Sequence, residues 1–329
     1  MTVPVADWIE KARSNKHKLL PLFLGQVLSL CITGTSTASS ALWKHHGISI
    51  PFTQNFCNYL LLAIVYNSLS RSWSTKRNWL YMIQEKSLIL WLPGFGYSLA
   101  DVQANVLAVL AFKNTSVLSA LIVSSWTLPC IMLLSTLCLG ARYRISHFLA
   151  VFLCLCGLAI LIYVDTKEDD GSKVNHSWIG DLICLLSASL YAVSNVAEEY
   201  LVNKFDTQNF LALAGFWGSL LCGGQALIFE YEQVSSIEWS WPVVGLIGTY
   251  VLCLFTMYSL VPTLYRWSGA IFMSMSLTTS NFYSLLIGLF FLESQMPPFY
   301  PVAYILVIGG VTLYNLAPSP HQYADYQPL

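Results

Sequence analysis

Three polar side chains recur at helical spacing within an apolar run of the sequence. Tyr97, Asp101 and Asn105 are each four residues apart, so on a helix they share one face. A phenol, a carboxyl and an amide on one face can bind a polar solute or carry a proton. If the run crosses a membrane, the acid costs at least about 2.5–3.5 kcal/mol, which a partner or a wet cavity must offset. The alternative is that Asp101 lies near the end of the helix and bonds nearby backbone or Lys113.

A second polar stripe lies further along the chain. Tyr191, Asn195 and Glu198 occur at i, i+4 and i+7, again on one helical face. We expect Tyr191 and Asn195 to face a cavity, and Glu198 either to join them or to lie at the membrane interface. Trp126 either stacks on a planar ligand or packs against other helices. The sequence therefore predicts a substrate site at Tyr97, Asp101, Asn105, Trp126, Tyr191, Asn195 and Glu198.

The composition indicates which elements position these side chains. Of 329 residues, 56% are hydrophobic and 10% are charged, whereas soluble domains carry about 25% charged residues. With a mean hydropathy of +0.59, the chain falls in the membrane class. The sequence has no basic stripe and no nucleic-acid-binding motif, so we expect no nucleic-acid partner.

Motifs of phosphate-binding loops, hydrolases and zinc proteases are absent from the sequence. We therefore expect no enzyme, no catalytic residue, no metal and no cofactor. The nine cysteines all lie within apolar runs, where they act as small hydrophobic residues. The expected partners are the lipid bilayer and a small-molecule substrate, with the protein a monomer or a homodimer.

Ten apolar segments are long enough to cross a bilayer, which takes about 20 residues. They predict an all-α membrane protein without a soluble domain. The segments span residues 19–42, 50–70, 87–111, 115–139, 145–164, 178–201, 208–230, 242–262, 268–292 and 299–317.

The basic residues orient these segments. With the N-terminus in the cytosol, twelve of the 16 Lys and Arg residues flank segments on the cytosolic side, so both termini are predicted to be cytosolic. The sequence alone leaves open the plasma membrane and the endosomal or Golgi membranes.

Two halves of the chain match at an offset of 153 residues. The segment 139–163 aligns without gaps on 292–316, and Gly157 then matches Gly310. Five helices per half give the halves opposite orientations, which is the inverted repeat of many transporters, with the substrate site between the halves. The predicted organisation is a cytosolic segment 1–18, a first repeat 19–164, a non-cytosolic linker 165–177, a second repeat 178–317 and a cytosolic tail 318–329.

The same offset pairs Lys113 with Arg266 on opposite sides of the membrane. As candidate gate residues, they would pair with acids in one state and release them in the other. The alternative is that each one is an interfacial anchor whose charge reaches toward water. The Pro-Gly-Phe-Gly run at 93–96 suggests a loosened or broken helix, of the kind that lines transporter cavities. The small polar run at 33–40 serves either helix packing or cavity lining.

Three stretches also resemble a known family. YSLADVQANVLAVLAF, ARYRISHFLAVFLCLCG and IGDLICLLSASLYAVSNVAEEYLV resemble segments of solute carrier family 35, F subgroup, within the drug/metabolite transporter superfamily. The resemblance extends over residues 19–317. It implies ten helices, an inverted repeat and transport of small organic solutes, and it leaves the cargo open.

The charges inside the segments bear on the cargo. A nucleotide sugar presents a diphosphate, which favours Arg or Lys, yet the only nearby bases are Lys113 and Arg266, both at helix ends. The leading hypothesis is a carrier of a neutral or cationic heterocycle, nucleobase-like or vitamin-like, working by alternating access. Asp101 or Glu198 would carry a coupling proton. The alternatives are a nucleotide-sugar/nucleoside-monophosphate antiporter and a receptor or scaffold without transport.

Overall fold

The structure is a computed structural model that describes residues 5–73, 87–114, 123, 125–168, 178–280, 282–283 and 300–318. Within these ranges the regular secondary structure is helix, and there is no strand. The predicted all-α class is therefore confirmed. The helices are α1 (Val5–His46), α2 (Pro51–Trp73), α4 (Ser87–Asn114), α6 (Thr127–Leu139), α7 (Ile145–Glu168), α8 (Trp178–Lys204), α9 (Thr207–Phe229), α10 (Tyr231–Ser235), α11 (Trp241–Leu277) and α13 (Tyr300–Leu316).

Most helix boundaries follow hydropathy, and the exceptions have physical causes. α1 begins at Val5 rather than at residue 19, because residues 5–18 include good helix formers although they are polar. Hydropathy detects apolar segments, so it does not register such an extension. The five-residue helix α10 was also not predicted. Residues 115–122 of the fourth predicted segment and 284–292 of the ninth lie outside the described residues.

Two helices differ from the expected pattern of breaks. α4 runs without interruption through Pro93, so the predicted loosening at 93–96 is not seen. The interruption lies instead in α11, where Gly269 has φ 80° and ψ 174°. Only glycine adopts this backbone region readily. The break falls at the second residue of the predicted segment 268–292, so α11 consists of two helices joined at Gly269.

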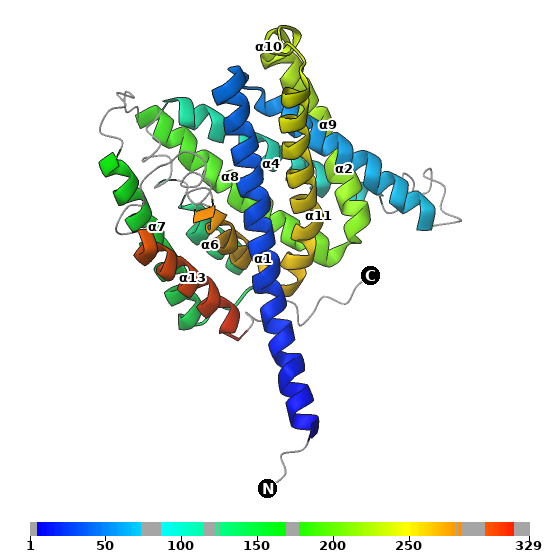
Figure 1. The fold of residues 1–329 in the computed structure, drawn as a ribbon. Coiled ribbons are helices and arrows are strands. Elements are labelled where there is room, and N and C mark those ends of the chain that lie inside the picture. The colour runs from blue at the N-terminus through cyan, green and yellow to red at the C-terminus, as the bar shows by residue number, and fades with distance from the viewer. Residues whose placement is uncertain are drawn as a thin grey trace.

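The helices pack in four long pairs (Figure 1). α2 lies along α9 on one side of the molecule, and α7 lies along α13 on the opposite side. Between them, α1 packs along α11 and α4 packs along α8. The polar stripes of α4 and α8 therefore lie in the middle of the molecule.

Glycines allow α7 and α13 to approach closely. A Cβ atom on Gly157 would lie 2.8 Å from the carbonyl oxygen of Ala303, and one on Gly310 would lie 2.7 Å from that of Ala150. The contact is reciprocal, since Gly157 and Gly310 are 153 residues apart, as are Ala150 and Ala303. The offset found in the sequence thus recurs in the packing of this helix pair.

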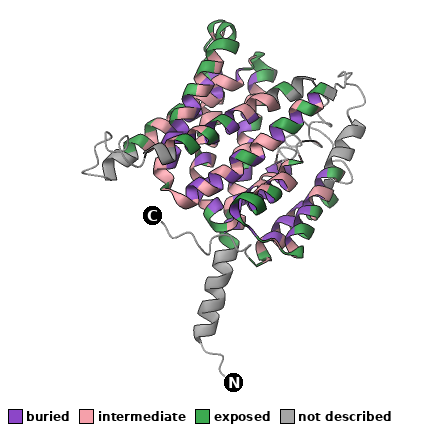
Figure 2. Ribbon diagram, turned by 180° about the vertical axis from the view of Figure 1, so that it is seen from behind, coloured by how far each residue is buried: buried purple, intermediate pink, exposed green. Residues whose placement is uncertain are grey.

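Apolar side chains cover much of the outer surface. Figure 2 shows buried residues on the inward faces of the helices and exposed residues on their outer faces. The exposed residues include many large hydrophobic side chains, such as Leu137, Phe152, Leu252 and Ile305. Within the described ranges, four helical stretches have the length and hydropathy to cross a membrane, namely Leu19–Trp43, Ile179–Lys204, Thr207–Phe229 and Trp241–Leu277. An outer surface of this kind suits contact with lipid.

Candidate functional site

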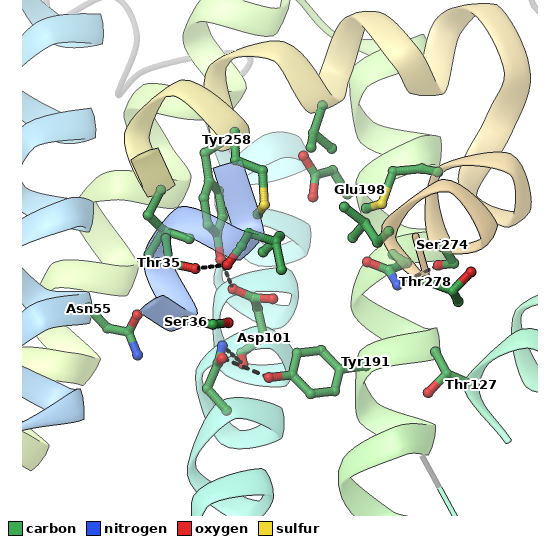
Figure 3. Close-up of a pocket in the computed structure, with 18 of the residues that line it drawn as sticks. Thr35, Ser36, Asn55, Asp101, Thr127, Tyr191, Glu198, Tyr258, Ser274 and Thr278 are labelled. Carbon is green, nitrogen blue, oxygen red and sulfur yellow. Dashed lines mark hydrogen bonds between the residues drawn. The ribbon is translucent and has the colours of Figure 1, made fainter. Parts of the chain in front are cut away.

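A cavity of about 450 Å³ opens between the helices in the middle of the molecule (Figure 3). Seven helices contribute to its wall: α1, α2, α4, α6, α7, α8 and α11. Its polar lining consists of Thr35, Ser36, Asn55, Tyr97, Asp101, Asn105, Ser125, Thr127, Tyr191, Asn195, Glu198, Tyr250, Tyr258, Ser274 and Thr278. Six of the seven predicted substrate residues are in this lining, and Trp126 is not.

The stripe on α4 lies in the cavity wall as its spacing predicts. Asp101 is only 7% exposed, and its Oδ2 atom accepts hydrogen bonds from the hydroxyls of Tyr258, at 2.7 Å, and Tyr59. The two hydroxyl oxygens are 3.0 Å apart. These donors come from α2 and α11, and they offset the cost of burying the acid. The alternative in which Asp101 bonds only nearby backbone or Lys113 does not match these contacts.

A second contact joins the stripe on α4 to the stripe on α8. The hydroxyl of Tyr191 donates to Oδ1 of Asn105 at 2.7 Å, and Nδ2 of Asn105 donates to the carbonyl oxygen of Asp101 at 2.8 Å. Figure 3 shows Tyr191 pointing from α8 toward α4, close to Asp101. The amide of Asn105 is therefore held in a fixed orientation at the cavity wall.

Glu198 lies inside the cavity wall and not at a helix end exposed to the interface. It is 4% exposed, and its Oε2 atom accepts a hydrogen bond of 3.0 Å from the hydroxyl of Tyr97. Its Oε1 atom is buried and has no hydrogen-bond partner among the described residues.

Asn195 is held by α11. Its Oδ1 atom accepts a hydrogen bond of 3.1 Å from the hydroxyl of Tyr265, and its Nδ2 atom lies 3.4 Å from Oγ of Ser274. The second contact is long, so the amide group keeps donor capacity for a molecule in the cavity.

Trp126 lies apart from the cavity residues. It is 44% exposed and precedes α6, while its neighbours Ser125 and Thr127 line the cavity. Ser125 and Trp126 form a turn, and Thr127 is the first residue of α6. The regular spacing of a helix does not extend into this turn, so it does not predict which of the three side chains points inward.

The candidate gate residues are positioned differently from each other. The guanidinium of Arg266 donates to the carbonyl oxygen of Val202 from Nε at 2.9 Å and from Nη2 at 2.7 Å, and Nη2 also donates to that of Phe205 at 3.2 Å. Arg266 thus caps the C-terminal end of α8, where a cation is favoured. The backbone of Lys113 belongs to α4, and its side chain lies outside the described residues.

Three further residues at or near the cavity were not among the predicted site residues. Tyr59 holds Asp101 from α2, and Asn55, one turn earlier on α2, lines the cavity. Their i, i+4 spacing inside the apolar segment 50–70 was a signal for a third polar stripe. Glu199, on α8, accepts a hydrogen bond of 2.9 Å from the backbone nitrogen of Ala270, directly after the break in α11.

The charge of the cavity is one-sided. Its described lining contains two acids, Asp101 and Glu198, and no Lys, Arg or His. The remaining polar groups are amides, phenols and aliphatic hydroxyls. Such a wall suits ligands that donate hydrogen bonds or carry positive charge, and it opposes anions.

Comparison with protein families gives one match over most of the chain. The model of the F group of solute carrier family 35 (SLC35F), described as "Solute carrier family 35", matches residues 14–316.

Individual relatives and a solved structure agree with this match. The mouse protein "Solute carrier family 35 member F2" is 37% identical over 305 residues, which cover 92% of this chain and 80% of the mouse protein. The protein of the same name from Xenopus tropicalis is 27% identical, covering 95% of this chain and 82% of its own length. An uncharacterized solute carrier family 35 member from Schizosaccharomyces pombe is 34% identical, and the match covers 92% of this chain and 59% of that protein.

One solved crystal structure superimposes with a TM-score of 0.66 at 18% identity, covering 90% of this chain and 98% of that one. At this identity the likeness shows the fold alone.

Proposed function

Because the chain belongs to the F group of solute carrier family 35, we propose that it carries a small neutral or cationic heterocycle across a membrane. The solute would be nucleobase-like or vitamin-like in size and polarity. The one observation that carries this proposal is the central cavity, which holds two acids and several amides and phenols, with no base among its described lining residues.

Family membership itself establishes the general class. The chain is an integral multi-pass membrane protein and a solute carrier, not an enzyme. The resemblance to the family, first drawn from three stretches of sequence, is confirmed over residues 14–316.

The proposed mechanism is alternating access between two inverted five-helix repeats, 19–164 and 178–317. The packing of the helices supports this organisation. Exchanging the halves maps the pair α1–α11 onto α8 with α4 and α6, and it maps the pairs α2–α9 and α7–α13 onto themselves. The reciprocal glycine contact of α7 and α13 obeys the same exchange. Rocking of one half against the other would open the cavity to each side in turn.

The cavity chemistry also supports the proposed cargo over an anionic one. A diphosphate would need forked guanidinium or ammonium partners, and Arg266 instead uses its donors on the backbone of α8. Asn195 and Asn105 offer amide groups, and Tyr191 and Tyr250 offer rings against which a planar solute can lie. The volume of about 450 Å³ falls in the usual range for small-molecule sites.

A ligand screen tests this proposal. Thermal unfolding of the purified, detergent-solubilised chain is measured with nucleobases, vitamins, nucleosides and nucleotide sugars. We expect nucleobases or vitamins to raise the melting temperature, because a ligand that binds the folded protein stabilises it. Asn195→Ala should reduce this shift, because the variant would bind the solute more weakly. Stabilisation by nucleotide sugars, reversed by nucleoside monophosphates, would favour the antiporter instead.

The predicted topology, membrane and assembly belong to the same proposal. Both termini would be cytosolic, the membrane would be the plasma membrane or an endosomal or Golgi membrane, and the protein would be a monomer or a homodimer. The bias of Lys and Arg residues toward one side supports the orientation.

A further inference from the structure

The two acids of the cavity differ in how their carboxyl groups are bonded. Two phenol hydroxyls, those of Tyr59 and Tyr258, donate hydrogen bonds to the same carboxyl oxygen of Asp101, Oδ2. Hydrogen bonds donated to a carboxylate stabilise its ionised form. The surroundings of Asp101 therefore favour a negative charge on this residue.

Glu198 has weaker support for a charge. It accepts one hydrogen bond, from Tyr97 to Oε2. Its other oxygen, Oε1, is buried without a hydrogen-bond partner in the described part of the chain. Burying an unpaired charge costs far more than burying a neutral polar group, and such a group usually neutralises instead. A protonated carboxyl group avoids most of this cost.

In the described part of the chain no cation is bonded to Glu198, and Arg266 of α11 donates instead to the backbone carbonyl oxygens of Val202 and Phe205. α4 contributes Tyr97 and Asp101, and α11 contributes the phenols of Tyr258 and Tyr265. The helices α6 and α9 contain no Asp, Glu, Lys, Arg or His in their whole length. On α8 itself, Glu199 is bonded to the backbone nitrogen of Ala270.

A negative charge on Asp101 therefore disfavours a second negative charge on Glu198. With Asp101 ionised, a charged Glu198 would be repelled by it across the cavity wall, since like charges disfavour joint ionisation. We propose that Glu198 is the carboxyl group that holds an exchangeable proton in this cavity, while Asp101 stays ionised. The role of Glu198 as a coupling site rests on the proposed transport function. The sequence left Asp101 and Glu198 as alternatives for the coupling proton, and the structure favours Glu198.

Infrared spectroscopy of the full chain in lipid membranes tests the assignment without a transported solute. A protonated carboxyl group has a C=O stretching band that a carboxylate lacks. We expect this band at neutral pH, and we expect it to shift when glutamate side-chain carboxyls carry ¹³C and to stay when aspartate carboxyls do. It should vanish on raising the pH, because the proton is exchangeable.

Three variants sharpen the result. Glu198→Gln should abolish the band, whereas Asp101→Asn and the adjacent control Glu199→Gln should retain it. The assignment is overturned if the band is missing at neutral pH, follows the aspartate label, or persists in Glu198→Gln. If a variant does not fold, the two isotope labels in the unmutated chain still decide between glutamate and aspartate. Failure of the transport proposal would appear separately, as vesicles that take up no solute despite a normal spectrum.

Discussion

At the scale of single residues, the burial of Asp101 is explained by partners from distant parts of the chain. Tyr59 lies 42 positions away in the sequence and Tyr258 lies 157 positions away. Both hydroxyls donate to the same carboxyl oxygen. These two hydrogen bonds replace those that the carboxyl group would make with water if it were exposed. The position of the acid is therefore fixed by contacts between α2, α4 and α11.

Removing one of these donors should destabilise the protein. Tyr258→Phe deletes a hydrogen bond to a carboxylate, and such bonds contribute about 1.5–3 kcal/mol. Tyr250→Phe is the matched control on the same helix, because the hydroxyl of Tyr250 donates to the neutral Oδ1 of Asn55. A neutral bond contributes about 0.5–1.5 kcal/mol. Thermal unfolding in detergent should show the larger loss for Tyr258→Phe, and equal losses would argue against a charged Asp101.

Spacing along the sequence indicated which polar residues share a helical face and therefore one part of the cavity wall. Tyr97, Asp101 and Asn105 share a helical face, and so do Tyr191, Asn195 and Glu198; the structure places all six in one cavity wall. Contacts made across the bundle are invisible to spacing along one helix. For that reason Tyr59 was missed as the partner of Asp101, and Arg266 was not foreseen as a cap of α8.

At the scale of elements, two backbone features organise the helices around the cavity. The first is the close approach of α7 and α13 at their paired glycines. The second is the break in α11 at Gly269, where Glu199 of α8 caps the new helix start and Arg266 caps the end of α8. A break was expected in α4 at 93–96, but α4 continues through Pro93, which lies inside the helix.

The glycine contact predicts a contrast between neighbouring residues of α13. Gly310→Ala would place its Cβ 2.7 Å from the carbonyl oxygen of Ala150, which is backbone and cannot turn away. We expect a loss of about 1–3 kcal/mol, as for overpacked cores. Gly309→Ala is the control, because nothing lies within 4 Å of its Cβ. Thermal unfolding should separate the two, and equal stability would contradict the described packing of α7 on α13.

The break in α11 predicts a second contrast. Gly269→Ala forces a side chain into a backbone region that costs other residues of order 1–3 kcal/mol. Gly248→Ala in the same helix has open space around its Cβ and should stabilise the helix slightly. The melting temperature should fall for Gly269→Ala only. A fall of the same size in both variants would mean that the break is not a fixed feature of α11.

At the scale of the whole molecule, the two proposed repeats would enclose one polar chamber. The helix pairs are exchanged or preserved as a two-fold relation between repeats requires, and the offset of 153 residues appears both in the sequence and at the glycine contact. An outer surface rich in exposed apolar side chains faces away from this chamber. This arrangement accounts for acids and amides within a chain that is 56% hydrophobic.

Uptake into vesicles tests most directly whether the solute passes through this chamber. Purified chain is reconstituted into liposomes, and the initial uptake rate is measured for the solute that stabilises it best in the screen. Asp101→Asn and Asn195→Ala should each reduce uptake roughly tenfold or more, the effect of losing about 1.4 kcal/mol of interaction. Asn67→Ala, an exposed asparagine outside the cavity lining, should transport at the unmutated rate. Unchanged uptake by both cavity variants would contradict the account.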